Sequence, residues 1–218
     1  MYNHDAIARE LEDLRKGLAA LDFTFNQKKL QFFHRYLEVL YHYRGKIHLL
    51  SRRDYHRIAR RHFLVSLMAL PFIGDCRTAC DLGAGAGFPS VPLKIMRPDI
   101  EFTLFESQQK KAAFLNHVIC TLGLSHIVVI HDRAEHHDAQ QFDVVLIKAA
   151  GRIKKLIKIV DHLMAPNGRA IFYKQYDVEE ELKAAEQVLR KRRLQACVEK
   201  TLTPMEHLPL ALVIIRKS

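Results

Sequence analysis

Hydrophobic and polar positions follow two different periods along the chain, and the change falls near residue 75. Before it, apolar side chains recur at helical spacing over residues 7–18, 30–41 and 58–70. The third stretch is expected to end before Pro71, because proline disfavours helical backbone in the residue that precedes it. This pattern predicts an N-terminal helical extension over residues 1–74.

From Thr78 onward, short apolar runs typical of buried strands alternate with helical patterns. The expected strands are residues 78–83, 101–106, 127–131, 142–148 and 169–174, and the expected helices are residues 91–96, 108–122, 152–164 and 178–193. Such alternation predicts an α/β fold with a mostly parallel, doubly wound sheet over residues 75–218. Two final runs, 196–202 and 211–215, are joined by a loop too short for a helical crossover, so they predict an antiparallel hairpin.

Composition narrows the class of protein. The 218 residues are 49% hydrophobic and 27% charged, and no apolar run approaches the ~20 residues that a membrane helix needs. The N-terminus lacks the profile of a signal peptide, so a cytoplasmic protein is expected. The four cysteines form no C-x-x-C pair; they are predicted to be reduced, with Cys120 and Cys197 in the core. The histidines and acids show no metal-binding spacing, so no metal is expected.

Charge points to a partner. The chain has 34 Lys and Arg against 24 Asp and Glu, a net charge of +10, and a polyanion is the simplest partner for it. The excess is concentrated in three clusters: Arg52, Arg53, Arg57, Arg60 and Arg61; Lys154, Lys155 and Lys158; and residues 190–193. A solvated helix face would explain any one of them, but the three together favour RNA or DNA.

The segment Asp81-Leu-Gly83-Ala-Gly85-Ala-Gly87-Phe88 follows the first expected strand. Its glycine spacing is not the G-x-G-x-x-G of dinucleotide-binding proteins, which argues against a nicotinamide-dependent oxidoreductase. D-x-G-x-G-x-G after a strand instead resembles motif I of S-adenosylmethionine-dependent methyltransferases. We therefore take Asp81, Gly83, Gly85, Gly87 and Phe88 as candidate cofactor residues. The alternative is a glycine-rich turn that only lets helix and strand pack closely.

Two further positions fit a nucleoside cofactor. Glu106 ends the second expected strand, where an acid can accept hydrogen bonds from both ribose hydroxyls. Ala134 and Glu135 follow the third strand, at the turn where methyltransferases hold adenine. The alternative for Glu106 is a favourable charge at the start of the next helix.

These residues belong to a wider resemblance. The motifs are Leu49-Leu-Ser51, Arg61-His62-Phe-Leu-x-Ser66-Leu, the glycine loop, Arg97-Pro98-Asp99, Lys111-x-x-Phe114-Leu, Arg133-Ala134-Glu135 and Phe142-Asp143-Val-Val. With them the chain resembles the small-subunit ribosomal RNA guanine-N7 methyltransferases, the glucose-inhibited division protein B family. The resemblance implies a class I, Rossmann-like methyltransferase fold with a seven-stranded sheet. It also implies methylation of a guanine in 16S ribosomal RNA and cofactor contacts at Gly83, Phe88, Glu106, Ala134, Glu135 and Lys148.

Four positions depart from the family pattern. The family usually has Asn at His48, Asp at Val65, Gly at Ser90 and Arg at Lys148. Lysine keeps the positive charge of arginine but not its planar, two-donor fork. The chain therefore reads as a divergent member, and methylation of another RNA or of a small molecule, or a cofactor-binding RNA-binding protein with little activity, stays open.

The chemistry itself asks little of the protein. Guanine N7 carries a lone pair and no proton, so the reaction needs positioning rather than a general base. This agrees with the absence of a [DN]-P-P-[YF] tetrapeptide and of a Pro-Cys nucleophile. Lys148, at the end of the fourth strand, is the candidate catalytic cation beside the cofactor carboxylate or guanine O6; the alternative is an exposed lysine at a strand end. A monomer acting on small-subunit ribosomal RNA is expected.

Overall fold

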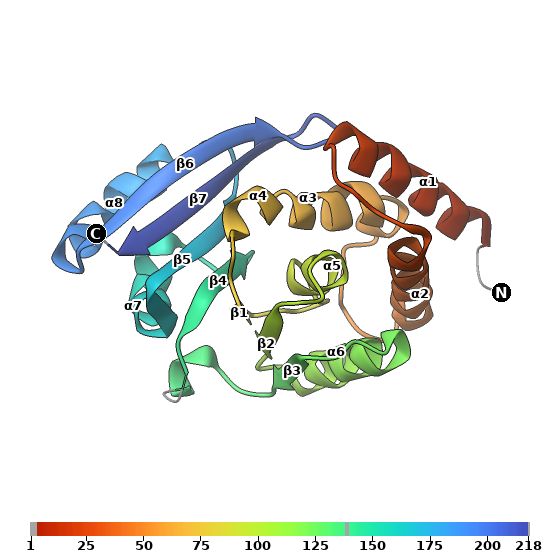
Figure 1. Ribbon diagram of the computed structural model, residues 1–218, viewed down its shortest axis with the longest axis horizontal. Coiled ribbons are helices and arrows are strands. Elements are labelled where there is room, and N and C mark those ends of the chain that lie inside the picture. The colour runs from red at the N-terminus through yellow and green to blue at the C-terminus, as the bar shows by residue number, and fades with distance from the viewer. Residues whose placement is uncertain (1–3, 138–139, 218) are drawn as a thin grey trace.

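The computed structural model describes residues 4–137 and 140–217, and these form a seven-stranded sheet in the order β3-β2-β1-β4-β5-β7-β6 (Figure 1). The strands are β1 Thr78–Leu82, β2 Glu101–Phe105, β3 Ile127–Ile130, β4 Phe142–Lys148, β5 Met164–Lys174, β6 Leu194–Leu202 and β7 Pro209–Lys217. Strands β1 to β5 are parallel, and β7 pairs antiparallel with both β5 and β6. The predicted parallel sheet with a C-terminal hairpin is confirmed.

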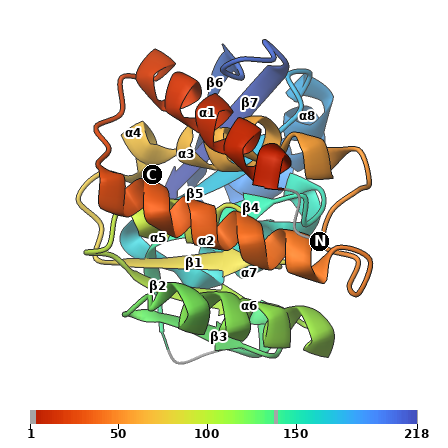
Figure 2. The ribbon, with the colours of Figure 1, turned by 90° about the vertical axis from the view of Figure 1, so that its right-hand side faces the viewer.

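Helices cover both faces of the sheet (Figures 1 and 2). Helices α7 Ile153–Leu163 and α8 Glu179–Lys191 pack on one face. The other face carries α5 Ser90–Met96, α6 Gln109–Leu122 and the N-terminal helices α1 His4–Ala20 and α2 Gln27–Tyr43. Local signals set several ends: Asn26 caps α2 by accepting the Lys29 amide at 2.9 Å, and Gly123 ends α6 in the left-handed conformation.

Alternation along each strand decides which side chains meet. In β4, Val144 and Leu146 pack with the N-terminal helices, whereas Val145 and Ile147 pack with α7 and α8. By the same alternation, Lys148 and Asp81 lie on the face that the N-terminal helices cover. Residues of the N-terminal helices can therefore contact Lys148 and Asp81 at the carboxyl edge of the sheet.

The third N-terminal helical stretch is not one regular helix. It consists of the π-helical turn η2 Ala59–Phe63, α3 Leu64–Leu67 and, after a short break, α4 Leu70–Ile73. The prediction that helix ends before Pro71 was wrong, because Pro71 lies in the first turn of α4. An amide is not needed for helical hydrogen bonding there, so proline is tolerated.

Strand β5 also begins earlier than predicted, at Met164 instead of residue 169. Its first part contains Pro166, Asn167 and Gly168, which resemble a turn in sequence. The pairing register with β4 shifts between Phe142 and Val144, and this irregularity accommodates the segment in the sheet. A Cβ at Gly168 would lie 2.8 Å from the Phe142 carbonyl oxygen, so only glycine fits this close approach.

The N-terminal helices share a hydrophobic core with the sheet. Phe33, Tyr36 and Phe63 belong to the same buried cluster as Phe88 and Phe114. Buried Glu10 of α1 accepts the amides of Ile58 and Ala59 at 3.1 and 2.7 Å, and so caps η2. The division into an extension, residues 1–74, and a methyltransferase domain, residues 75–218, stays a prediction.

All four cysteines are free thiols, but their burial differs from the prediction. Cys76 and Cys80 are buried, whereas Cys120 and Cys197 are exposed. Cys120 lies on the outer side of α6, opposite its buried positions Leu115, Val118 and Leu122, and Cys197 lies on the edge strand β6, most of whose side chains are exposed. Over residues 4–137 and 140–217, no helix is long and apolar enough to cross a membrane.

Candidate active site

The glycine loop after β1 is built for close backbone approach. Gly83, Gly85 and Gly87 have φ values of 73°, 58° and 91°, which side chains rarely adopt. The amides of Gly83 and Ala84 both donate to the Phe105 carbonyl oxygen, at 2.9 and 3.0 Å, and hold the loop against the end of β2. A Cβ at Gly85 would meet only the Gly83 carbonyl oxygen within 4 Å, so the loop leaves open space on that side.

Asp81 stands buried at the base of this loop. The Ser90 hydroxyl donates to its Oδ2 at 2.6 Å, so Ser90, where the family usually has glycine, ties the start of α5 to β1. Asp81 Oδ1 is buried without a hydrogen-bond partner among the described residues. Burial raises the pKa of Asp81 to about 6, against the effect of the Ser90 hydrogen bonds. The free oxygen can accept a hydrogen bond from a polar cofactor group beside the loop.

Glu106 connects the loop to β2. It is buried, and its two carboxylate oxygens accept the amides of Gly85 at 2.9 Å and Gln108 at 2.8 Å. Each carboxylate oxygen has more than one acceptor site, so Glu106 can still accept bonds from ribose hydroxyls. The backbone bonds fix the carboxylate in place before a ligand arrives.

A cavity of about 200 Å³ lies next to these groups. Gly83, Phe105, Ala134, Glu135 and Ala150 are among the residues that line it. The wall combines apolar side chains, among them Phe105 and Leu156, with the polar side chains of Ser107, Asp132 and Arg133, and the short turn η3 Ala134–His136 forms one side. An adenine ring fits this combination of apolar surface and polar groups, and Glu106 stands one residue from Ser107 of the same wall.

Gly87 and Phe88 have a different place. A Cβ at Gly87 would lie 2.6 Å from Tyr36 Oη, and Tyr36 donates to the Ala86 carbonyl oxygen. Phe88 is buried against Tyr36, Phe63 and His62, and neither Gly87 nor Phe88 lines the small cavity. Both residues contact the N-terminal helices, which support the loop on the side away from the small cavity.

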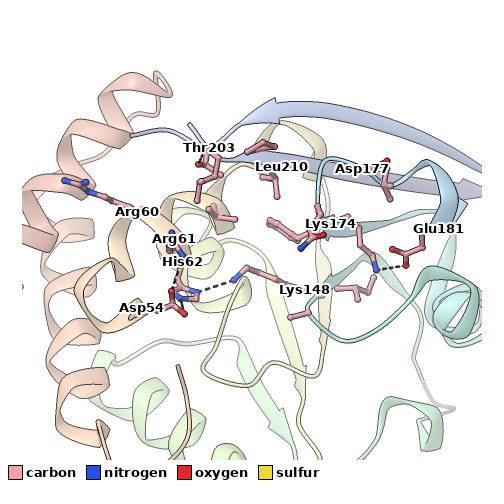
Figure 3. A pocket seen from close by; sticks show the side chains of 18 of the residues that line it. Asp54, Arg60, Arg61, His62, Lys148, Lys174, Asp177, Glu181, Thr203 and Leu210 are labelled. Carbon is pink, nitrogen blue, oxygen red and sulfur yellow. Dashed lines mark hydrogen bonds and ion pairs between the residues drawn. The ribbon is translucent and has the colours of Figure 1, made fainter. Parts of the chain in front are cut away.

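Lys148 projects into a second cavity of about 590 Å³ (Figure 3). The turn after β4 separates the two cavities: Lys148 and Gly151 line this one, and Ala150 lines the smaller one. Lys148 Nζ lies 3.4 Å from His62 Nδ1 and 5.4 Å from the centre of the Phe88 ring. Burial lowers the pKa of Lys148 to about 8, and the nearby Asp81 and Asp54 carboxylates oppose the shift.

His62 and Asp54 are site residues that sequence reasoning did not select. His62 stacks on Phe88 with ring centres 4.8 Å apart, and its Nε2 lies 3.8 Å from Asp54 Oδ2. Burial lowers the pKa of His62; the His62 imidazole, and then the Ser51 hydroxyl, hold the pKa of Asp54 well below its usual range. The motif around His62 was visible in the sequence, but nothing local indicates its contact with residue 148.

The neighbouring arginines are mostly paired within the protein. Arg60 binds Asp13 at 2.7 Å, and Arg61 binds Glu206 of the β6–β7 loop at 2.8 Å. Arg57 lies 3.6 Å from the same Glu206. The arginine cluster, which the charge pattern counts among the signs of an RNA or DNA partner, is therefore only partly free: three of its members have carboxylate partners.

Arg52 and Arg53, by contrast, are exposed. Neither forms a side-chain hydrogen bond or ion pair within residues 4–137 and 140–217.

Lys174 donates to Glu181 at 2.7 Å and to the Gly151 carbonyl oxygen at 2.6 Å, so both contacts hold its ammonium group at the cavity wall (Figure 3). Lys148 is therefore the better candidate for a cation at the reaction centre.

The glycine loop after β1, the acid after β2, the cavity beside them and the sheet order define a class I S-adenosylmethionine-dependent methyltransferase. The chain belongs to the GidB family, whose model, described as rRNA small subunit methyltransferase G, matches residues 29–208.

Relatives named ribosomal RNA small subunit methyltransferase G support this membership. The protein of Halalkalibacterium halodurans is 33% identical, and the match covers 95% of this chain and 91% of that protein. The protein of Chromobacterium violaceum is 32% identical, with 74% of this chain and 78% of that protein covered. The predicted family, enzyme class and cofactor are confirmed.

Solved structures show the same fold. A putative O-methyltransferase from Klebsiella pneumoniae has a TM-score of 0.62 at 10% identity, and the match covers 92% of this chain and 94% of that one. M. jannaschii TYW2 in complex with AdoMet has a TM-score of 0.59 at 13% identity, with 80% of each chain covered. The predicted fold class is confirmed.

Within the described ranges, no group of three or more His, Cys, Asp or Glu could hold a metal ion.

Proposed function

We propose that this protein transfers a methyl group from S-adenosylmethionine to N7 of a guanine in 16S ribosomal RNA, as a cytoplasmic monomer. The observation that carries the proposal is the pair of adjoining cavities in a member of the GidB family. The smaller cavity suits the adenosyl group, and the larger one, with Lys148 inside it, has room for a nucleobase.

The residues around the smaller cavity fit the cofactor. Gly83, Ala134 and Glu135 line this cavity and would enclose the adenine, and Glu106, next to Ser107 of the same wall, would hold the ribose. Asp81, on the face that the N-terminal helices cover, would accept from a polar cofactor group beside the glycine loop. Gly85 contributes through its backbone, since its amide fixes Glu106. When bound, S-adenosylmethionine supplies an electrophilic methyl group on a sulfonium.

The transfer itself balances without an added base. The N7 lone pair forms the new bond to carbon while the carbon–sulfur bond breaks, and its electrons return to sulfur as a neutral thioether. The protein's task is to hold the two reactants in line at attack distance. Lys148 would do so by donating to guanine O6 or to the cofactor carboxylate, and His62 and Asp54 fix the surroundings of its ammonium group.

Mapping the methylated base tests this proposal directly. Unmethylated 16S ribosomal RNA and assembled small subunits are each incubated with the protein and S-adenosylmethionine, and 7-methylguanine is located by aniline-induced cleavage. We expect one modified guanine, and binding that weakens steeply with added salt because phosphates are neutralised. Methylation of an exocyclic amine, or of a small molecule with no effect of salt, would contradict the proposal.

A further inference from the structure

A third, strongly basic cavity lies in the loop between α2 and η1 Asp54–His56, outside the site described above. Its volume is about 460 Å³. Four basic side chains line it, together with one tyrosine: Arg44, Lys46, His48, Arg52 and Tyr55. Among the described residues, no carboxylate lines it. A concave surface with several cations and no anion of its own fits an anionic ligand.

The cations of this cavity differ from the neighbouring arginine cluster. Arg57 and Arg61 share the Glu206 carboxylate, and Arg60 pairs with Asp13. Arg44, His48 and Arg52 form no ion pair with a carboxylate in the part of the chain that the structure describes. The charges of Arg44 and Arg52 therefore stay available for a ligand.

Tyr55 is a second, independent sign of a ligand. Its side chain is only 3% exposed, and its hydroxyl is buried without a hydrogen-bond partner among the described residues. The Arg44 guanidinium lies over the Tyr55 ring, 5.1 Å from its centre. A buried hydroxyl without a partner is destabilising, whereas the same hydroxyl beside cations can donate to an anionic oxygen.

The position of the cavity connects it to the active site. Ser51 donates to Asp54 Oδ2 at 2.6 Å, and the Asp54 amide donates back to Ser51 Oγ at 3.3 Å, which fixes a tight turn. Asp54 lines the large cavity that holds Lys148, while Arg52 and Tyr55 line the basic one. Asp54 and Tyr55 are neighbours in the chain, with Cα atoms about 3.8 Å apart, so one turn contributes residues to both cavities.

We infer that the basic cavity is a phosphate-binding subsite that holds the RNA backbone beside the target nucleotide. The inference rests on the proposed function. Arg44 and Arg52 supply charge to the phosphate, and the Tyr55 hydroxyl donates a hydrogen bond to one of its oxygens. His48 lines this cavity and not the one that holds Lys148. The replacement of the family's asparagine by His48 therefore affects binding of the RNA backbone and not the reaction centre. Such contacts set the position of the strand and carry no base specificity.

The charge test uses an Arg44→Gln/Arg52→Gln double variant and, as a matched control, Arg190→Gln/Arg193→Gln, two exposed arginines at the end of α8 and in the turn after it. Binding of 16S ribosomal RNA transcript is measured at several salt concentrations. We expect the first variant to lose roughly tenfold or more in affinity and to flatten the salt slope by about 1.4–1.8, for two phosphate contacts. The control should lose less on both measures, and S-adenosylhomocysteine binding should not change in either variant.

The hydroxyl test uses Tyr55→Phe, with Tyr176→Phe at an exposed position as its control. Tyr55→Phe keeps the ring beneath Arg44 and leaves the backbone oxygen that accepts from Tyr41. We expect it to weaken RNA binding roughly 3- to 10-fold without a change in salt slope, since it removes a hydrogen bond and no charge. Melting temperatures show whether each variant is folded.

Three outcomes would overturn the inference: an unchanged salt slope in Arg44→Gln/Arg52→Gln, equal losses in both arginine pairs, or unchanged RNA affinity in Tyr55→Phe. Each of these leaves the proposed function standing if the wild-type protein still methylates the RNA. If the wild-type protein neither binds nor methylates 16S ribosomal RNA, the proposed function fails and the subsite fails with it.

Discussion

At the scale of single residues, methyl transfer should depend most on the charge of Lys148, which faces His62 inside the large cavity. For Lys148→Met, we expect single-turnover methylation at saturating RNA and cofactor to fall at least about tenfold, or ~1.4 kcal/mol of barrier. Lys148→Arg keeps the charge and restores the family's residue, so it should retain activity. A wild-type rate for Lys148→Met would remove this residue from the reaction.

The same residue predicts a pH dependence. Burial lowers the pKa of Lys148 to about 8, with His62 beside it and the Asp81 and Asp54 carboxylates nearby. If the ammonium form is required, kcat/KM should fall as pH rises through about 8, because Lys148 loses its proton there. Lys148→Arg should lack this limb, since a guanidinium stays protonated. The same alkaline limb in both proteins would assign it to another group.

Glu106 gives the corresponding test of the cofactor site. Glu106→Ala removes the acceptor for the ribose and should weaken S-adenosylmethionine binding by about 1.5–3 kcal/mol, measured by calorimetry. Glu101→Ala, at the exposed start of the same strand, is the control and should bind normally. Unchanged affinity in Glu106→Ala would exclude the carboxylate from the site.

At the scale of elements, the contact between α2 and the glycine loop should be intolerant of added volume. Gly87 has φ +91°, and a Cβ there would lie 2.6 Å from Tyr36 Oη and 2.8 Å from Val91 Cγ2. Gly87→Ala should therefore cost about 2–5 kcal/mol of stability, the sum of backbone strain and overpacking. Gly123 has φ +63°, but a Cβ added there would meet no atom within 4 Å. Gly123→Ala should therefore cost about 1–2 kcal/mol of stability, from backbone strain alone. Equal costs in urea unfolding would contradict a packing role for Gly87.

The junction of α1 and η2 should make stability depend on pH. Burial raises the pKa of Glu10 from 4.5 to about 7, although the Ala59 and Ile58 amides lower it. The folded chain thus keeps this proton in a range where the unfolded chain has released it, so stability falls as pH rises from about 4.5 to 7.

Urea unfolding of wild type and Glu10→Gln at pH 5 and pH 8 isolates this contribution. Wild type should lose roughly 1–3 kcal/mol more than the variant over this interval, because glutamine does not titrate there. Asp81, whose pKa burial also raises, is present in both proteins and cancels from the difference. The same loss in wild type and variant would mean that Glu10 keeps its ordinary pKa.

At the scale of the whole molecule, residues 1–74 should be required for the fold of the rest. They cover Phe88, Val91 and Phe114 in one shared core, and Glu206 of the last loop pairs with Arg61. A fragment of residues 75–218 would expose this apolar surface, so we expect no cooperative thermal transition and no S-adenosylhomocysteine binding. A fragment that melts cooperatively and binds would show that residue 75 begins a domain able to fold alone.

The sequence by itself determined the fold class, the alternation of strands and helices along the chain, the glycine loop and the terminal hairpin. These follow from hydrophobic period, glycine spacing and loop length, which act between residues close in sequence. The same kind of evidence gave wrong predictions at Pro71, at the start of β5 and at Cys120 and Cys197. At each of these positions the local composition is typical of a structure that differs from the one found in the fold.

Only the tertiary structure decided which distant side chains meet. The contact of His62 with Lys148 spans the chain from a π-helical turn to a strand end, and it exists because strand alternation turns Lys148 toward the N-terminal helices. The pairing of Arg60 and Arg61 with Asp13 and Glu206 depends likewise on how α1 and the last loop pack. Charge counting cannot separate paired from free cations, because a partner carboxylate is recognised only once the fold has brought it within reach.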